Sequence, residues 1–140
     1  MQALLLDTHV WLWMVTEDRG RMPASAWAEI ERLGERNSLA VSDVSFWELA
    51  LKAGKKQLGL APSTRAWLKK AGKTPGLGVI QLDREVLIRS TELDIPTRDP
   101  ADRMLVATAL RYDLRLATAD RNLLDYAQRE RGLAVLDCSI

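Results

Sequence analysis

The sequence predicts an α/β protein whose central, mainly parallel sheet has four or five strands and is flanked by helices. Short apolar runs alternate along the chain with longer stretches that carry apolar residues at helical spacing, an order typical of parallel sheets. The first run, residues 3–6, is wholly apolar, as expected for a strand buried on both faces. No repeat, low-complexity tract or linker interrupts the 140 residues, so residues 1–140 are expected to form one domain.

Five segments are predicted to be strands. Each is short and apolar and is bounded by polar or turn-forming residues. They are residues 3–6, 39–42, 79–82, 114–118 and 133–136. A loop is expected over residues 73–78, which contain Pro75, Gly76 and Gly78.

Helices are predicted between these strands. Trp27, Ile30 and Leu33 share one face of a helix that follows Pro23, with charged residues on the opposite face. Other helices begin after residues that cap well, such as Asp83. The predicted helices are residues 8–15, 24–33, 44–53, 62–72, 84–93, 100–109 and 121–131.

The segment from Arg98 to Ala109 places two carboxylates at the start of an apolar helix. Pro100 suits the first helical position, because its missing N–H would have no partner there. Asp99 is then expected to be the N-cap and Asp102 to lie at the third helical position, both near the positive end of the helix dipole. Helix capping is one explanation of these acids. The other is that Asp102 is part of an acidic metal site.

The composition excludes several classes of protein. With a net charge of +1, a nucleic-acid-binding surface would need locally clustered basic residues, and the run Lys52, Lys55 and Lys56 is by itself more typical of a solvated surface. The single cysteine allows no disulfide within the chain, and no apolar stretch is long enough to span a bilayer. We therefore expect a cytoplasmic protein with no membrane association. One histidine, His9, cannot support a two-histidine ribonuclease mechanism.

Four carboxylates are predicted to meet at one edge of the sheet. Asp7 ends the first strand, Asp120 follows the fourth, Asp102 begins the preceding helix, and Glu48 lies on the helix after the second strand. Ligands of open parallel sheets bind beyond the carboxyl ends of the strands. Since nearby carboxylates repel one another unless a cation lies between them, Mg²⁺ or Mn²⁺ is the expected ligand.

Each of these acids also has a simpler explanation. Asp7 and Asp120 precede predicted helices and can cap them, and Asp102 can compensate a helix dipole. Glu48 lies among bulky apolar residues and could form an ion pair with an arginine of another element.

Four segments, in this order, resemble a known family. They are residues 4–9 (LLLDTH), 42–50 (SDVSFWELA), 98–109 (RDPADRMLVATA) and 116–120 (LATAD). Together they resemble PIN domains and, more narrowly, the VapC-type toxin ribonucleases of type II toxin–antitoxin pairs, from residue 3 to about residue 136. The resemblance implies a metal-dependent endoribonuclease with an RNA substrate, a small cognate antitoxin and a homodimeric assembly.

By the same resemblance, the catalytic metal ligands would be Asp7, Glu48, Asp102 and Asp120, holding Mg²⁺ or Mn²⁺. A cation bound there would activate a water molecule for attack on the RNA phosphodiester.

Further residues are expected around these ligands. Thr8 matches a position where the family often has a hydroxyl, Thr118 is expected to order the site, and Asp99 to cap the helix or support the ligands. The candidates to hold flanking phosphates are Arg98, Arg103, Arg121 and Lys52.

Aromatic residues near Asp7 are expected to have other roles. His9 is expected to pack at the start of the first helix, and Trp11 and Trp13 to face an antitoxin groove in part.

Two alternative functions compete with that of a ribonuclease. A phosphatase of the haloacid-dehalogenase kind needs a second aspartate two residues after the first, and His9 stands at that position. A catalytically inactive PIN-like module that binds RNA or protein would be expected to lack some of the acids, and this chain keeps all four.

Overall fold

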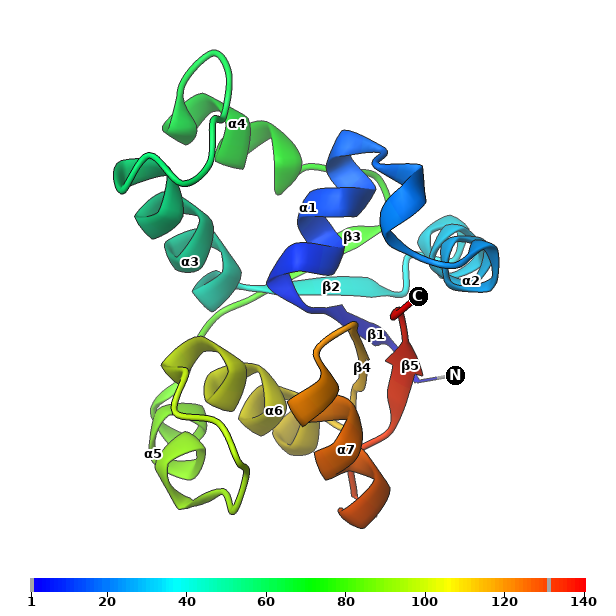
Figure 1. Cartoon of the computed structure of the whole chain (residues 1–140), viewed down its shortest axis with the longest axis vertical. Coiled ribbons are helices and arrows are strands. Elements are labelled where there is room, and N and C mark those ends of the chain that lie inside the picture. The colour runs from blue at the N-terminus through cyan, green and yellow to red at the C-terminus, as the bar shows by residue number, and fades with distance from the viewer. Residues whose placement is uncertain (1, 131) are drawn as a thin grey trace.

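A five-stranded parallel sheet organises the chain, as Figure 1 shows for the computed structural model, which describes residues 2–130 and 132–140. The strand order is β3-β2-β1-β4-β5, and every neighbouring pair is parallel. The strands are β1 (Leu4–Leu6), β2 (Leu39–Ser42), β3 (Leu77–Ile80), β4 (Arg115–Thr118) and β5 (Val135–Asp137). The predicted α/β class is therefore confirmed.

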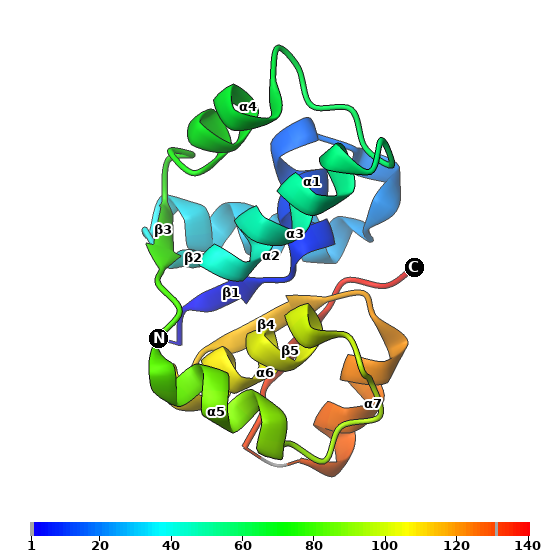
Figure 2. The same ribbon diagram turned by 90° about the vertical axis from the view of Figure 1, so that its left-hand side faces the viewer.

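Helices cover both faces of this sheet. Figure 2 shows α1 to α4 on one side of the strands and α5 to α7 on the other. The helices are α1 (Thr8–Thr16), α2 (Ala24–Glu35), α3 (Asp43–Gly54), α4 (Thr64–Ala71), α5 (Arg84–Glu92), α6 (Pro100–Tyr112) and α7 (Arg121–Arg129), with a short 3-10 helix, η1 (Arg19–Arg21), before α2. No helix among the residues described is long and apolar enough to cross a membrane.

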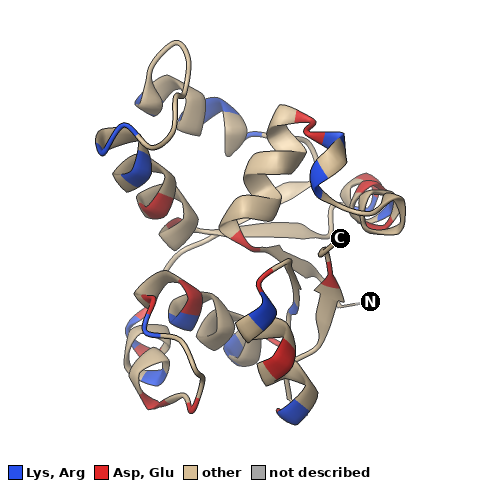
Figure 3. Ribbon diagram, in the orientation of Figure 1, with Lys and Arg blue, Asp and Glu red and all other residues tan. Residues whose placement is uncertain are grey.

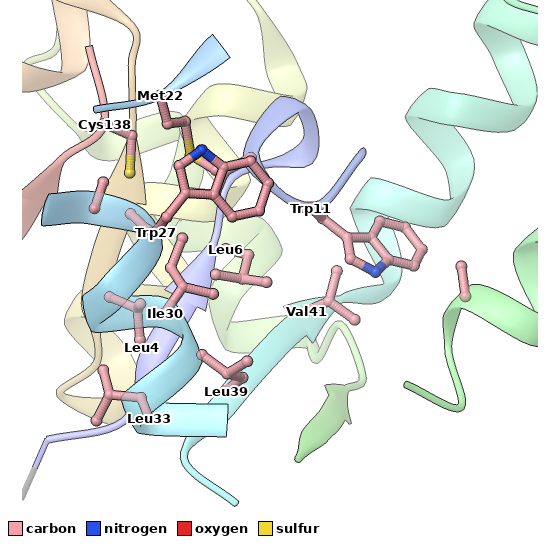
Figure 4. Close-up of a cluster of buried hydrophobic side chains, with 14 of the residues drawn as sticks. Leu4, Leu6, Trp11, Met22, Trp27, Ile30, Leu33, Leu39, Val41 and Cys138 are labelled. Atoms are coloured by element: carbon pink, nitrogen blue, oxygen red, sulfur yellow. The ribbon is translucent and has the colours of Figure 1, made fainter. Parts of the chain in front are cut away.

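Alternate residues of the central strand β1 point into two separate cores. Leu4 and Leu6 pack with α1 and α2, and Figure 4 shows Trp27 and Ile30 of α2 in this cluster. Leu5 packs on the opposite face with residues of α6 and α7. All three leucines are fully buried, which contributes roughly 1.5–3 kcal/mol for each side chain. The strand that ends at Asp7 is thus held rigidly from both sides.

The start of α6 has the predicted capping arrangement. Asp99 is the N-cap, and its Oδ1 accepts a hydrogen bond from the Ala101 N–H at 3.0 Å. Pro100 is the first helical residue, and Asp102 lies in the first turn. The side chain of Asp102 is therefore presented at the positive end of a 13-residue helix.

Two predicted strands are shifted in the structure. β3 is Leu77–Ile80 rather than residues 79–82, and β5 is Val135–Asp137 rather than residues 133–136. Each forms an edge of the sheet, where pairing with β2 or β4 decides which residues are extended. A turn at Gly76, with φ of 83°, brings Leu77 directly into register with Leu39.

Candidate active site

A cavity of about 400 Å³ lies at the carboxyl edge of the sheet, between α1 and α3 on one side and the starts of α6 and α7 on the other. We call it the acidic cavity. Its lining residues are Asp7, His9, Trp13, Glu48, Lys52, Asp99, Asp102, Ala119 and Asp120. All the carboxylates predicted to meet at this edge therefore line one cavity, although they come from distant parts of the chain.

Asp7 is fixed at the floor of the cavity by hydrogen bonds to both carboxylate oxygens. Its Oδ1 accepts from the Thr8 backbone N–H at 2.7 Å, and its Oδ2 accepts from the Thr118 hydroxyl at 2.7 Å. Asp7 is thus the N-cap of α1 as well as a cavity residue. Burial raises the pKa of Asp7 above its usual value, although the hydrogen bond from Thr118 works in the opposite direction.

The surroundings of Asp102 disfavour the charged form of its carboxyl group. Its pKa is raised to about 8, first by burial and then by the negative charges of Asp7, Asp99, Asp120 and Glu48. Proximity to a helix N-terminus would by itself lower that pKa, so the surrounding carboxylates and the loss of water outweigh the dipole. A cation in the cavity would relieve this repulsion.

Glu48 is buried and only partly neutralised. Its Oε2 lies 3.7 Å from the ammonium group of Lys52, one helical turn later on α3, whereas its Oε1 is buried with no hydrogen-bond partner. No arginine among the described residues pairs with Glu48, so the predicted alternative of an arginine ion pair is wrong. Lys52 Nζ also lies 3.1 Å from His9 Nε2.

Asp120 combines a capping role with a place in the cavity. Its Oδ1 accepts hydrogen bonds from the backbone N–H groups of Asn122 at 2.8 Å and Leu123 at 3.2 Å at the start of α7. Its own N–H donates to the Thr118 hydroxyl at 3.1 Å. Thr118 therefore connects Asp7 to Asp120, two of the carboxylates that line the cavity.

Arg103 lies next to Asp102 but is directed into the protein. Its guanidinium donates to the carbonyl oxygens of Ser90, Leu93, Ile95 and Thr97 at 2.5–3.2 Å. These bonds tie the end of α5 and the following loop to the start of α6. Because four of its five N–H groups are used in this way, Arg103 has little capacity left to hold a phosphate.

The remaining candidates differ in their distance from the acids. Lys52 lines the cavity, whereas Arg98 and Arg121 are exposed and are not among the lining residues. Thr8 is fully buried, and its hydroxyl lies 2.8 Å from that of Ser45. Sequence reasoning missed Ser45; its spacing of three residues from Glu48 on the same helix was the available signal.

The tryptophans near Asp7 have different environments. Trp11 is fully buried against Phe46 and Trp67, so the expectation that it faces a partner groove is wrong. Trp13 is half-buried and lines the acidic cavity. His9 is exposed and also lines the cavity, rather than packing at the start of the helix.

The donor atoms in the cavity suit a hard divalent cation. Within residues 2–130 and 132–140, no group of three or more His, Cys, Asp or Glu side chains is spaced closely enough to hold a metal ion as it stands. The carboxylates nevertheless line one cavity, and Glu48 has a buried oxygen without a hydrogen-bond partner. The pKa of Asp102 is raised by burial and then by the neighbouring carboxylates. Carboxylate oxygens are the ligands that Mg²⁺ and Mn²⁺ prefer.

Comparisons with known proteins identify the family and the fold. A family model described as the PIN domain matches residues 4–129. Ribonuclease VapC22 of Mycobacterium tuberculosis is 34% identical over 127 residues, which cover 88% of this chain and 91% of the relative. The residues matched by the family model include all those that line the acidic cavity.

Solved structures share the fold at lower sequence identity. VapBC2 from Rickettsia felis, bound to a DNA fragment from its promoter, matches with a TM-score of 0.69, 16% identity and coverage of 98% of this chain and 99% of that chain. DNA-bound VapBC from Salmonella typhimurium gives a TM-score of 0.68, 21% identity and 98% coverage of both chains. A toxin-antitoxin complex from Klebsiella pneumoniae gives 0.62, 15% identity and coverage of 99% and 100%. At these identities the likeness concerns the fold.

Proposed function

The chain belongs to the PIN domain family, and from this premise we propose that it is a metal-dependent endoribonuclease, the toxin of a toxin–antitoxin pair. The observation that carries the proposal is the gathering of Asp7, Glu48, Asp102 and Asp120 around one cavity at the carboxyl edge of the sheet. Its relative VapC22, at 34% identity, is a ribonuclease. We further propose that one PIN domain accounts for residues 1–140.

We assign Asp7, Glu48, Asp102 and Asp120 as the residues that would hold Mg²⁺ or Mn²⁺. When bound, such an ion lowers the pKa of a coordinated water molecule and neutralises charge on the phosphate oxygens. The reaction adds water across a P–O bond of RNA. The chain itself supplies a rigid set of carboxylates: Thr118 fixes Asp7, and the cap of α7 fixes Asp120.

Protonation of Asp102 links cation binding to pH. With a pKa of about 8, this carboxyl group holds a proton near neutral pH in the metal-free protein. Binding of a cation would release that proton, so the affinity for the cation is expected to increase as the pH rises.

Substrate contacts are assigned to the basic side chains that remain available. We assign Lys52, which lines the acidic cavity, to a phosphate oxygen, and the exposed Arg98 and Arg121 to phosphates further along the RNA strand. Arg103 is left out of this set, because its guanidinium is bonded to backbone carbonyls. Thr8 and Asp99 are assigned supporting roles next to Asp7 and Asp102.

The proposed partners follow from the family and from the complexes that share the fold. We propose a small cognate antitoxin, a homodimeric assembly and action on RNA in the cytoplasm. The structural neighbours include VapBC proteins and a toxin-antitoxin complex, which supports the antitoxin.

Incubation of the purified chain with total RNA tests the proposed function. Cleavage is expected with Mg²⁺ or Mn²⁺ and not with EDTA, and Asp7→Asn is expected to reduce it at least about 100-fold, because a ligand with two fixed oxygens is lost. Asp125→Asn is the matched control, since Asp125 is exposed on α7 and does not line the cavity. Cleavage that persists in EDTA or in Asp7→Asn would contradict a metal-dependent mechanism.

A further inference from the structure

One wall of the acidic cavity is aromatic. His9 and Trp13 lie one turn apart on α1, both line the cavity, and their ring centroids are 6.1 Å apart with the planes tilted by 41°. Lys52 reaches this wall from α3, with Nζ 3.1 Å from His9 Nε2. Aromatic surface thus lines the same cavity as the carboxylates proposed to hold the metal ion.

Trp13 differs from the other tryptophans in its environment. Trp11 and Trp27 are buried in the core that Figure 4 shows, and Trp67 packs against Trp11 with ring centroids 6.1 Å apart. Trp47 is 51% exposed, but it lies beside a groove with Phe46 and Leu68 and does not line the acidic cavity. Trp13 also packs in part against this core, but of the five tryptophans it is the one that lines the acidic cavity.

This wall combines uncharged aromatic surface with one basic side chain. A nucleotide, which carries both a base and a phosphate, matches that combination better than a simple ion does. Figure 3 shows α1 almost wholly in tan, since its nine residues include no Lys, Arg, Asp or Glu. Among the residues described, Lys52 is the one Lys or Arg side chain that lines the cavity, and Glu48 on the same helix lies 3.7 Å from it. A volume of about 400 Å³ is within the range of about 300–1,000 Å³ found for small-ligand sites.

We propose that Trp13, with His9 beside it, is a base-stacking subsite that holds an unpaired nucleobase next to the scissile phosphate of RNA. This proposal rests on the ribonuclease function proposed above and adds a binding residue to it. Bases of single strands stack on aromatic side chains with little sequence preference, whereas a base paired in a duplex has no free face to offer. Trp13 therefore restricts the substrate to single-stranded segments and leaves sequence choice to other contacts.

Steady-state kinetics with defined oligonucleotides test the subsite. The bond that the wild-type chain cleaves is first mapped in total RNA. A short single-stranded RNA containing that bond is then compared with two oligonucleotides that lack the base on one or the other side of it. For the intact RNA, Trp13→Leu is expected to raise KM about tenfold with little change in kcat, and Trp13→Phe to retain most of the affinity. Removal of the stacked base is expected to raise KM for the wild type but not for Trp13→Leu.

The variants separate stacking from general damage to the fold. Trp47→Leu is the matched control, with an unchanged KM expected, and thermal unfolding identifies any variant that has lost structure. If Trp13→Leu fails to fold, the subsite is still tested by the KM of Trp13→Phe and by the KM of the wild type for the oligonucleotides that lack a base. An unchanged KM in Trp13→Leu, or equal sensitivity of both proteins to base removal, would overturn the subsite while RNA cleavage stands. No cleavage by the wild type with either metal would overturn the proposed function, and the subsite with it.

Discussion

The wall of the acidic cavity formed by α1 and α3 mixes charges and aromatic rings, whereas the charged groups lining the α6–α7 wall are all carboxylates. On the first wall, Lys52 lies 3.7 Å from Glu48 and partly offsets its charge. On the second, Asp99, Asp102 and Asp120 lie at helix N-termini, where the helix dipoles are the compensation that the chain provides. The α6–α7 wall is therefore where a bound cation would relieve the most repulsion.

Arg103 shows how this asymmetry is maintained. It follows Asp102 directly, and a guanidinium facing the cavity would neutralise that carboxylate. Instead its N–H groups are bonded to backbone carbonyls between α5 and α6. Arg103 thus stabilises the α6–α7 wall through bonds to the backbone and does not neutralise its carboxylates. The pKa of Asp102 is accordingly about 8.

The largest effect is expected from removing Arg103. Arg103→Met leaves four backbone carbonyls without their donors and is expected to lower the free energy of unfolding by about 2–4 kcal/mol. Arg103→Lys should recover little of this, because one ammonium group cannot reproduce the planar fork. Urea denaturation measures both variants.

Arg98→Met is the control for Arg103→Met, because Arg98 is exposed and nearby in the sequence, and its stability is expected to change by no more than about 0.5 kcal/mol. If Arg103→Met were as stable as the wild type but failed to cleave RNA, Arg103 would be a substrate contact. The α6–α7 wall would then carry a basic group, as the α1–α3 wall does.

A smaller effect, with a defined pH dependence, is expected at Asp102. Its folded-state pKa of about 8 lies above the ordinary value of 3.8, so between pH 4 and 8 the folded state binds more protons than the unfolded state. The stability of the metal-free protein should therefore fall as the pH rises through this range. Asp102→Asn removes the titrating group and is expected to be more stable than the wild type by about 1–2 kcal/mol at pH 8, after discounting for partial solvent exposure, and nearly equal to it at pH 4.

Melting curves in EDTA at a series of pH values measure this difference at Asp102. Asp125→Asn, on the exposed side of α7, should show no such pH-dependent gain. A melting temperature below that of the wild type for Asp102→Asn at pH 8 would mean that the carboxylate stabilises the metal-free fold. Repulsion among the carboxylates of the α6–α7 wall would then not destabilise the protein.

Local chemistry made much of this arrangement predictable from the sequence. The caps formed by Asp99 and Asp120 depend on backbone N–H groups two or three residues away, so capping rules predicted both. The meeting of the acids followed from the order of strands and helices, because the carboxyl ends of parallel strands share one edge.

Long-range contacts were not predictable in the same way. The carbonyl partners of Arg103 depend on the path of the loop after α5, which no periodic pattern specifies. Thr8 and Ser45 are 37 positions apart, and only the packing of α1 against α3 brings their hydroxyls together. The shifts of β3 and β5 have the same origin, since pairing with a neighbouring strand sets the limits of an edge strand.

The coupling between the hydroxyls of Thr8 and Ser45, roughly 1 kcal/mol, is the smallest predicted effect and tests how the α1–α3 wall is held. Both residues are fully buried, and their oxygens are 2.8 Å apart. Thr8→Val or Ser45→Ala leaves one buried hydroxyl unpaired and is expected to lower the free energy of unfolding by about 1–2 kcal/mol. Because the double variant removes both partners of the same bond, its loss should be smaller than the sum of the single losses by roughly 1 kcal/mol. Additive losses would mean that each hydroxyl acts separately, and that apolar packing, rather than this bond, holds α1 and α3 together beside the more strongly charged α6–α7 wall.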